Sequence, residues 1–372
     1  MKILFNDLPS QWREIKDKCS PAIEKLLQSG AYIGGEALEG FEKSFSAYTG
    51  KKYAAGISNG TDALKLAVQA FEFYDTTTNV IIPANTYIAD ALAVAHQPKG
   101  NFEITLIDCD EFFQLDLKAT EEHLISSRER YDNCIIMPVH LYGHPVNMRI
   151  VKSLADKYDC RIIEDASQAH GARSQDEMVG THGDICAYSL YPGKSLGAMG
   201  DAGIVTTNNE NYYHKICELR NYGSPQKYHN NDIGWNNRLD PLQAVFLNHK
   251  LVHLDKWNLK KGEIAAEYSR GIDSPWITTP TNDTHVSRNV YHIYPILTNR
   301  REELQTHLSD QGVPTIIHYP IPIQKSEPFK HLNERPNPLT CEKAEKVLSL
   351  PMHPYWRPEE VEHIITAINK FQ

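Results

Sequence analysis

Lys194 lies in a glycine-rich, charge-poor stretch whose composition favours chemistry at its amine. The stretch reads SLYPGKSLGAMGDAG from residue 189 to residue 203. The apolar run 185–190 that leads into it predicts a buried strand opening into a tight loop. A partly desolvated lysine loses its proton more easily, and the neutral amine can form a Schiff base with a carbonyl compound or with pyridoxal phosphate. Lys194 is therefore the candidate catalytic residue.

The same stretch is compatible with two other interpretations, a surface lysine and a phosphate-binding P-loop. Most lysines are solvated surface charges, so Lys194 needs support from elsewhere in the chain. Gly193, Lys194 and Ser195 also imitate the end of a phosphate-binding P-loop, but that motif requires a glycine where Tyr188 stands. The sequence therefore disfavours a nucleoside triphosphatase.

Asp165 is the second candidate, because it closes the apolar run RIIED at residues 161–165. An unpaired carboxylate at the end of a buried strand is costly, so we expect a cationic partner. A protonated pyridine nitrogen would suit, since the pair keeps the ring an electron sink. The structural alternative is an aspartate bound by nearby backbone N–H groups.

A third signal is a candidate phosphate site where a short strand, Tyr53–Ser58, runs into Asn59, Gly60, Thr61 and Asp62. An apolar helix follows, and we expect its cap at the threonine or the aspartate. The free N–H groups and the dipole of a helix start favour an anion, and Gly60 allows close approach to the backbone. Many such turns bind nothing, so the signal is weak alone.

The elements that position these residues alternate between short apolar runs and helical patterns. Strands are expected at 79–83, 103–110, 134–140, 161–166, 185–190 and 203–207, with helices at 86–96 and 147–158 among them. This order predicts an α/β fold with a mostly parallel sheet covered by helices on both faces. Ligands of such sheets bind beyond the carboxyl ends of the strands. We therefore expect convergence of Asn59, Tyr87, His140, Asp165 and Lys194, which follow strand ends.

The rest of the chain predicts a division into a large domain, 1–250, and a smaller C-terminal α+β domain, 251–372. Helical patterns cover 9–29, 36–49 and 210–221, and a long helical stretch runs from Pro241 to about Arg270. The polar loop 223–238 is either solvated and idle or able to reach over a neighbouring subunit's site.

Composition and charge indicate a cytoplasmic protein that acts on a metabolite. The net charge of -9 disfavours nucleic acid or an acidic membrane as partner. The seven cysteines show no CxxC spacing and are expected as free thiols of a reducing compartment. No signal-peptide pattern or membrane-length apolar run is present, and His140 and His144 lack the glutamate of a HExxH motif, so no metal site is expected.

The motifs, taken in order along nearly the whole chain, resemble the DegT/DnrJ/EryC1/StrS family of sugar aminotransferases, which are fold-type I pyridoxal phosphate enzymes. The resemblance rests on SNGTDAL at 58–64, PANTYIA at 83–89, PVHLYGHPVNM at 138–148, IIEDASQAHGA at 162–172, YSLYPGKSLGAMGDAG at 188–203, GWNNRLDPLQA at 234–244 and SLPMHP at 349–354.

The resemblance implies roles around the cofactor ring. Lys194 would form the Schiff base and shuttle a proton from the α carbon of the amino donor. Asp165 would pair with the pyridine nitrogen, and Gln168 with the phenolic oxygen. Tyr87 would stack on the ring.

It also implies how the cofactor phosphate is held. Gly60 and Thr61 would supply backbone N–H donors, and Ser189 its hydroxyl. Asn236 would add an amide from a partner subunit, so the resemblance implies a homodimer with shared active sites.

Within the family, YPGK and GDAG at 200–203 resemble the branch that aminates C3 of dTDP-3-keto-6-deoxyhexoses, with L-glutamate as donor. This implies substrate contacts for His318, Tyr319, Tyr191 and, from the neighbouring chain near the pyrophosphate, Lys227. Gln324 stands where relatives often have histidine, so the resemblance assigns no role there.

Three alternatives stay open at this stage. One is amination at C4 of a nucleotide-linked 4-keto-6-deoxy sugar. Another is a pyridoxal phosphate-dependent sugar dehydratase, but such relatives replace the lysine with histidine, and Lys194 is present. The last is a non-catalytic regulatory relative, which would be expected to lose Asp165 or Lys194.

Overall fold

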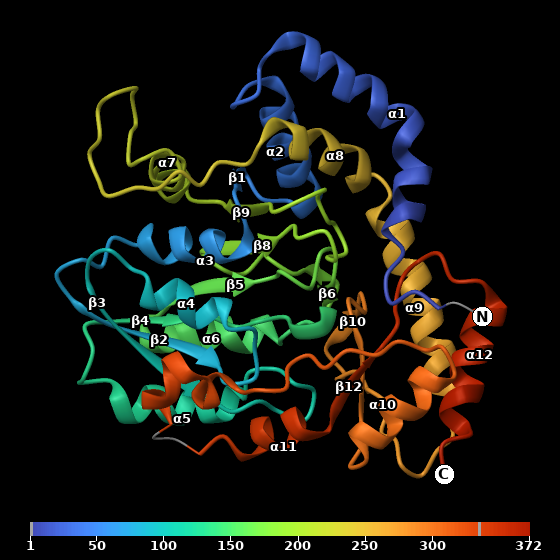
Figure 1. The fold of residues 1–372 in the computed structure, drawn as a ribbon. Helices are drawn as coiled ribbons and strands as arrows, with labels where there is room; N and C mark the ends of the chain where they lie inside the picture. The colour runs from blue at the N-terminus through green and yellow to red at the C-terminus, as the bar shows by residue number, and fades with distance from the viewer. Residues whose placement is uncertain (1–2, 334–335) are drawn as a thin grey trace.

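A seven-stranded sheet forms the centre of the computed structural model, which describes residues 3–333 and 336–372 (Figure 1). Its strands, in spatial order, are β1 (Tyr53–Ile57), β9 (Gly203–Thr207), β8 (Ile185–Ser189), β5 (Arg161–Asp165), β4 (Asn133–Ile136), β2 (Thr77–Pro83) and β3 (Asn101–Ile107). The five strands from β8 to β3 are parallel, and β9 is antiparallel to both of its neighbours. The predicted mostly parallel sheet is confirmed.

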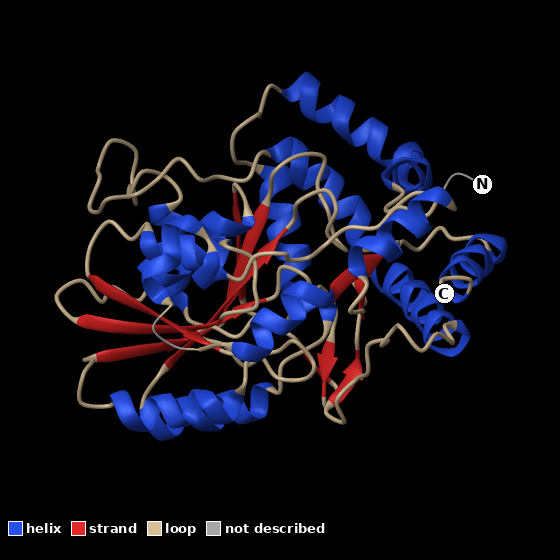
Figure 2. Ribbon diagram, turned by 60° about the horizontal axis from the view of Figure 1, so that its bottom comes forward, coloured by secondary structure: helices blue, strands red, loops and turns tan. Residues whose placement is uncertain are grey.

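Both faces of the sheet are apolar, because successive residues of each strand pack in opposite directions. In β2, Val80 and Ile82 pack with α3 (Gly60–Gln69), α4 (Ala89–Ala95) and α7 (Glu210–Leu219). Ile81 packs instead with α5 (Leu117–Ser127) and α6 (Met148–Tyr158). Figure 2 shows helices on either side of the strands. This double cover explains why the strands appear in the sequence as continuous apolar runs.

Towards β1 and β9, the sheet packs against α2 (Glu36–Thr49) and α8 (Pro241–Leu251). The first helix, α1 (Leu8–Ser29), lies against α8 through Ile15, Cys19 and Phe246. The long helical stretch predicted from Pro241 to Arg270 is interrupted, since α9 (Leu254–Gly271) is a separate helix. A turn closes at His253, whose N–H donates to the Lys250 carbonyl at 2.9 Å.

The C-terminal part builds its own apolar core around α9 and a two-stranded sheet. The strands are β11 (Tyr294–Leu297) and β12 (Val347–Leu350), with α10 (Arg301–Asp310) and α12 (Pro358–Asn369) against them. Ile3 from the other end of the chain joins this core. The domain boundary at residue 250 stays a prediction.

Short elements complete the chain. They are the three-stranded sheet of β6 (Arg173–Ser174), β7 (Glu177–Met178) and β10 (Val286–Arg288), the 3₁₀ helices η1 (Leu141–Gly143), η2 (Ile323–Lys325) and η3 (Glu327–Leu332), and α11 (Pro338–Lys346). All seven cysteines are free thiols. None of the helices in the described part is long and apolar enough to cross a membrane.

Candidate active site

A cavity of about 850 Å³ opens at the carboxyl ends of β5 and β8, where the C-terminal part meets the sheet. Most of the residues singled out in the sequence line it: Gly60, Thr61, Tyr87, Asp165, Gln168, Ser189, Tyr191, Lys194, His318 and Tyr319. Segments far apart in the chain thus converge on one space, as expected for a sheet of this topology.

Two buried lysines hold the loop that carries Lys194 by hydrogen bonds. Lys250 donates from Nζ to the Gly197 carbonyl at 2.6 Å, and Lys261 donates from Nζ to the Ser195 hydroxyl at 2.8 Å. These contacts join the loop to α8 and α9. The Lys194 backbone is therefore held at a fixed place in the wall of the cavity.

The Lys194 amine is prepared for nucleophilic chemistry. Burial lowers its pKa to about 8, although the charge of the Asp165 carboxylate acts in the opposite direction. An ordinary lysine is almost wholly protonated at neutral pH, so this shift greatly enlarges the neutral fraction. The neutral amine is the form that attacks a carbonyl carbon.

Asp165 stands at the end of β5 and faces the same cavity. Its Oδ1 accepts a hydrogen bond from the Ser167 N–H at 2.8 Å, and its charge acts on Lys194. The structure therefore contains both features considered for it, a backbone donor and a nearby cation. The acceptor capacity that remains suits a cationic ring nitrogen in the cavity.

The candidate phosphate site is the start of α3. Asn59 is the cap, because its Oδ1 accepts from the Asp62 N–H at 2.8 Å. The helix thus begins at Gly60, earlier than the predicted cap at Thr61 or Asp62. The first N–H groups of a helix have no partner within it, and here they border the cavity. A Cβ added to Gly60 would lie 2.6 Å from the Ser189 Cβ, so only glycine fits this cradle.

Gln168 connects the sheet to the C-terminal segment. Its Oε1 accepts from the Tyr142 N–H at 2.7 Å, and its Nε2 donates to the Tyr319 hydroxyl at 3.1 Å. The Tyr142 hydroxyl in turn donates to the His318 carbonyl. Tyr87 faces this group, with its ring centroid 5.3 Å from that of Tyr319. One hydrogen-bond network therefore joins Gln168, predicted to contact the cofactor, to Tyr319 and His318, predicted to contact the substrate.

His318 is a neutral ring in this site. Burial lowers its pKa to about 4, and the charge of Lys194 acts in the same direction. Its Nδ1 lies 2.9 Å from the Ser349 hydroxyl. At neutral pH His318 can therefore offer hydrogen bonds but no positive charge.

His140 does not join the cavity, so its expected convergence with the other strand-end residues is wrong. Its Nε2 contacts the Glu164 carboxylate at 3.1 Å, and its Nδ1 accepts from the Val146 N–H at 3.0 Å. Both ring nitrogens are therefore used inside the protein. The backbone beyond β4 still runs beside β5, since the His140 N–H donates to the Asp165 carbonyl at 3.0 Å, but the fully buried His140 ring contacts Glu164 and does not line the cavity.

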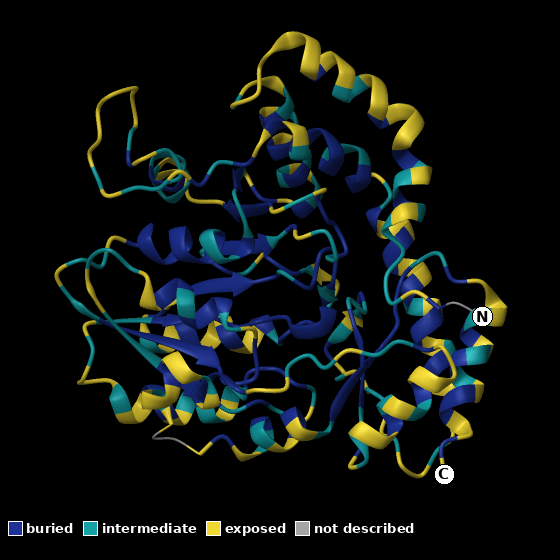
Figure 3. Ribbon diagram, in the orientation of Figure 1, coloured by how far each residue is buried: buried dark blue, intermediate teal, exposed yellow. Residues whose placement is uncertain are grey.

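Neither Lys227 nor Asn236 lines the cavity of its own chain. They belong to the loop between α7 and α8, which projects from the body of the molecule (Figure 1) and is largely exposed (Figure 3). Lys227 Nζ lies 5.1 Å from the centroid of the Tyr228 ring. Any role in catalysis must therefore be exerted on another chain or after the loop moves.

Several cavity residues were missed by sequence reasoning. Phe5, Asn6 and His292 lie in stretches without a motif, and Met352 lies in the SLPMHP motif but was given no role; tertiary packing brings all four to the site. Asn6, for example, donates from Nδ2 to the Gly193 carbonyl at 3.4 Å. Asp90, which is buried and does not itself line the cavity, had a usable signal, because it is the one charged residue in the apolar helix ADALAVA.

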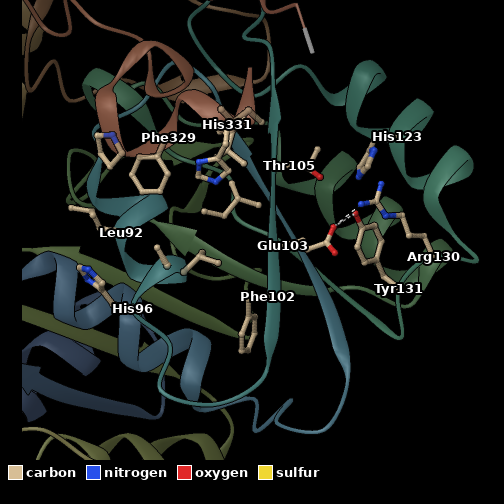
Figure 4. A pocket seen from close by; sticks show the side chains of 16 residues that line it. Leu92, His96, Phe102, Glu103, Thr105, His123, Arg130, Tyr131, Phe329 and His331 are labelled. Atoms are coloured by element: carbon tan, nitrogen blue, oxygen red, sulfur yellow. Dashed lines mark hydrogen bonds and ion pairs between the residues drawn. The ribbon is translucent and has the colours of Figure 1, made fainter. Parts of the chain in front are cut away.

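A second cavity, of about 570 Å³, lies at the edge strand β3 (Figure 4). Glu103 in its wall accepts from Arg130 Nη2 at 2.8 Å and from the Tyr131 hydroxyl at 2.9 Å. Phe102, Phe329 and Leu332 make much of it apolar. Among its described lining residues there is no lysine, so the carbonyl chemistry is assigned to the larger cavity.

Comparison with known proteins agrees with this geometry. A model of the DegT/DnrJ/EryC1/StrS aminotransferase family matches residues 13–369. The chain is 37% identical to dTDP-3-amino-3,4,6-trideoxy-α-D-glucose transaminase of Streptomyces venezuelae, covering 100% of this chain and 96% of that protein. It is 38% identical to dTDP-3-amino-3,6-dideoxy-α-D-galactopyranose transaminase of Aneurinibacillus thermoaerophilus, covering 99% of each.

Solved structures agree as well. Streptomyces venezuelae DesV, in complex with a ketimine intermediate, superposes with a TM-score of 0.92 at 36% identity, over 100% of this chain and 98% of that one. NtdA of Bacillus subtilis, with bound cofactor PMP, superposes with a TM-score of 0.88 at 27% identity, over 99% and 84% of the two chains.

Proposed function

The chain belongs to the DegT/DnrJ/EryC1/StrS aminotransferase family, and we propose that it transfers the amino group of L-glutamate to C3 of a dTDP-linked 3-keto-6-deoxyhexose. Its cofactor is pyridoxal phosphate. The observation that carries the proposal is one cavity that brings together the Lys194 amine, the Asp165 carboxylate and the start of α3.

The residues present fit the cofactor. The crowded contact of Gly60 with Ser189 leaves the first N–H groups of α3 open to a phosphate, and the Ser189 hydroxyl adds a donor. Asp165 would hold the ring nitrogen, and Gln168 the phenolic oxygen. When bound, pyridoxal phosphate supplies the aldehyde that receives the amino group and an electron sink for negative charge at the α carbon of the donor.

Lys194 would accept and return the proton in the transfer. With a pKa of about 8, its Nζ is neutral in a substantial fraction of molecules near neutral pH and can accept a proton from the α carbon of the amino donor. Lys250 and Lys261 fasten the loop on which it stands, so the amine needs little reorientation between accepting and returning the proton. Proximity of this kind contributes much of the rate of such transfers.

The keto sugar would enter beside Tyr191, His318 and Tyr319, which line the cavity. Because His318 is neutral, we assign it to hydrogen bonding with the sugar, next to the reacting carbon. The pyrophosphate needs a cation elsewhere, and Lys227 is the candidate.

We further propose that Lys227 and Asn236 act on the active site of a second copy of the chain. Their loop projects from the body of the molecule (Figure 1), and it presents Tyr222, Tyr228 and Ile233 as exposed large side chains. Exposed apolar groups on a projecting loop favour burial against a partner. A homodimer with shared sites would bring an amide to the phosphate and an ammonium to the pyrophosphate.

Incubation of the enzyme with L-glutamate and the dTDP-linked 3-keto-6-deoxyhexose, followed by NMR of the product, tests the function. The proposal predicts a new amine at C3 and formation of 2-oxoglutarate. An amine found only at C4 when the 4-keto sugar is supplied, or no transfer to either sugar, would refute it.

A further inference from the structure

Asp90 is a buried carboxyl that lies against the carboxyl of Asp165. It belongs to the first turn of α4 and is 0% exposed. Its Oδ2 accepts from the Thr86 hydroxyl at 2.8 Å, whereas its Oδ1 meets no donor within the described residues. Asp165 lies within hydrogen-bonding reach of it. Two carboxyl groups can hydrogen-bond to each other only when one of them holds a proton.

The surroundings decide which carboxyl holds the proton. The groups that face Asp90 are Asp165 on β5, Lys194 on the loop after β8, and Tyr319 on the C-terminal segment. Burial raises the pKa of Asp90 well above its usual range, and the charge of Asp165 raises it further. Asp165, in contrast, accepts from the Ser167 N–H and faces the cavity. The proton therefore belongs on Asp90.

We propose that Asp90 stays a neutral carboxylic acid at neutral pH and donates a hydrogen bond from its free oxygen to the Asp165 carboxylate. The inference rests on the proposed function, in which Asp165 holds the cofactor's ring nitrogen. An apolar site can keep a carboxylic acid neutral near pH 7 so that it serves as a donor. Here the donated bond fixes which Asp165 oxygen remains for the ring nitrogen.

Asp90 is thus a positioning residue that acts through Asp165. The other interpretation is an ionised aspartate that only complements the start of α4. That interpretation would place two negative charges in contact inside the protein, which is unfavourable even with Lys194 nearby. The two interpretations differ in one observable property, the protonation state of Asp90 in the folded enzyme.

Infrared spectroscopy of the complete holoenzyme measures that state, because a protonated carboxylic acid and a carboxylate have separate carbonyl bands. At about pH 8, Asp110 is ionised, since burial raises its pKa only to about 6. We expect a neutral-acid band in the wild type and its loss in Asp90→Asn. Asp62→Asn is the matched control, because that first-turn aspartate is paired with Lys65 at 2.6 Å and should contribute no such band.

Absence of the band from the wild type, or its persistence in Asp90→Asn, would overturn the proposal. If Asp90→Asn does not fold, the test uses wild-type enzyme labelled with carbon-13 at the aspartate carboxyls. The proposal then requires that the label shift the neutral-acid band. An unshifted band would belong to a glutamic acid and would also overturn the proposal.

A pH titration of the cofactor's visible absorbance tests positioning. Asp90→Asn keeps an amide donor for Asp165, so its midpoint should stay near the wild-type value, whereas Asp90→Ala should shift it by about one pH unit. Equal shifts in both variants would reduce Asp90 to a structural role. Wild-type enzyme that shows the band but aminates no keto sugar would refute the proposed function and leave the Asp90 assignment standing.

Discussion

Gly60 and Ser189 approach so closely that a Cβ carbon on Gly60 would lie 2.6 Å from the Ser189 Cβ. The contact joins the start of α3 to the end of β8. It leaves backbone N–H groups and a hydroxyl as the surface presented to the cavity, which is what a phosphate needs.

Gly60→Ala should therefore weaken binding of pyridoxal phosphate by tenfold or more, an effect of about 1.4 kcal/mol. The added methyl must push Ser189 away or tilt the start of the helix. Gly40→Ala is the matched control, because Gly40 lies in α2 with open space around its Cβ position. Fluorescence titration of the cofactor-free enzyme with pyridoxal phosphate measures both variants, and equal affinities would remove the phosphate assignment.

The lysine, the aspartate and the glycine of the site could be predicted from the sequence, because local signals mark them. Lys194 follows an apolar run typical of a buried strand, and Asp165 closes another such run. Gly60 stands between a predicted strand and a predicted helix. Parallel strands place their carboxyl ends at one edge, so convergence followed from topology. The family motifs added the cofactor and the keto sugar.

Other parts of the site depend on packing that the sequence does not display. Asn6 reaches the cavity because the N-terminal segment lies against the loop of Lys194. His140 contacts the buried Glu164 carboxylate and does not line the cavity, and this side-chain pairing is not visible in the apolar run. Similarly, the local sequence gives no signal that the helical stretch after Pro241 is interrupted before Leu254.

The rate at which the cofactor-free enzyme forms its covalent bond with pyridoxal phosphate should depend on pH through Lys194. The neutral amine reacts, so the rate should rise about tenfold per pH unit below the pKa of about 8 and level off above it. An amine with the ordinary value of 10.5 would instead keep gaining rate through pH 9. Stopped-flow absorbance between about pH 6 and 10 separates the two profiles.

Lys227→Ala should mainly raise the KM for the sugar nucleotide, about five- to a hundredfold, because it removes a cation from a remote pyrophosphate. The glutamate half-reaction should be nearly unchanged. Lys260→Ala is a suitable control, since that exposed lysine on α9 pairs with Glu263 in its own helix. Stopped-flow measurement of each half-reaction decides, and equal damage to both by Lys227→Ala would contradict the substrate role.

His318→Ala should behave differently from the lysine variant. Since His318 is neutral and lies close to Lys194, its loss should lower kcat for the keto sugar as well as weaken binding. The salt dependence of KM should stay at the wild-type value, because no charge is removed. A KM that becomes less sensitive to salt would mean that the ring is charged in the complex.

Mixing inactive Lys194→Ala subunits with Asn236→Ala subunits should restore activity if sites are shared. In the mixed dimer, one site would receive an intact lysine from one chain and an intact Asn236 from the other. Activity should thus exceed that of either variant alone in mixtures that mass spectrometry shows to have exchanged subunits. No recovery would assign the loop to its own chain.

The central claim is that Lys194 carries the cofactor, and borohydride trapping tests it most directly. Two other lysines, Lys250 and Lys261, also have pKa values lowered by burial, to about 8 and about 7, so the site of attachment is a real choice. The holoenzyme is reduced, digested and analysed by mass spectrometry. We predict that the visible band bleaches and that the reduced cofactor is found on Lys194 alone, with no label in Lys194→Ala. A cofactor found on Lys250 or Lys261, or wild-type turnover by Lys194→Ala, would contradict the account.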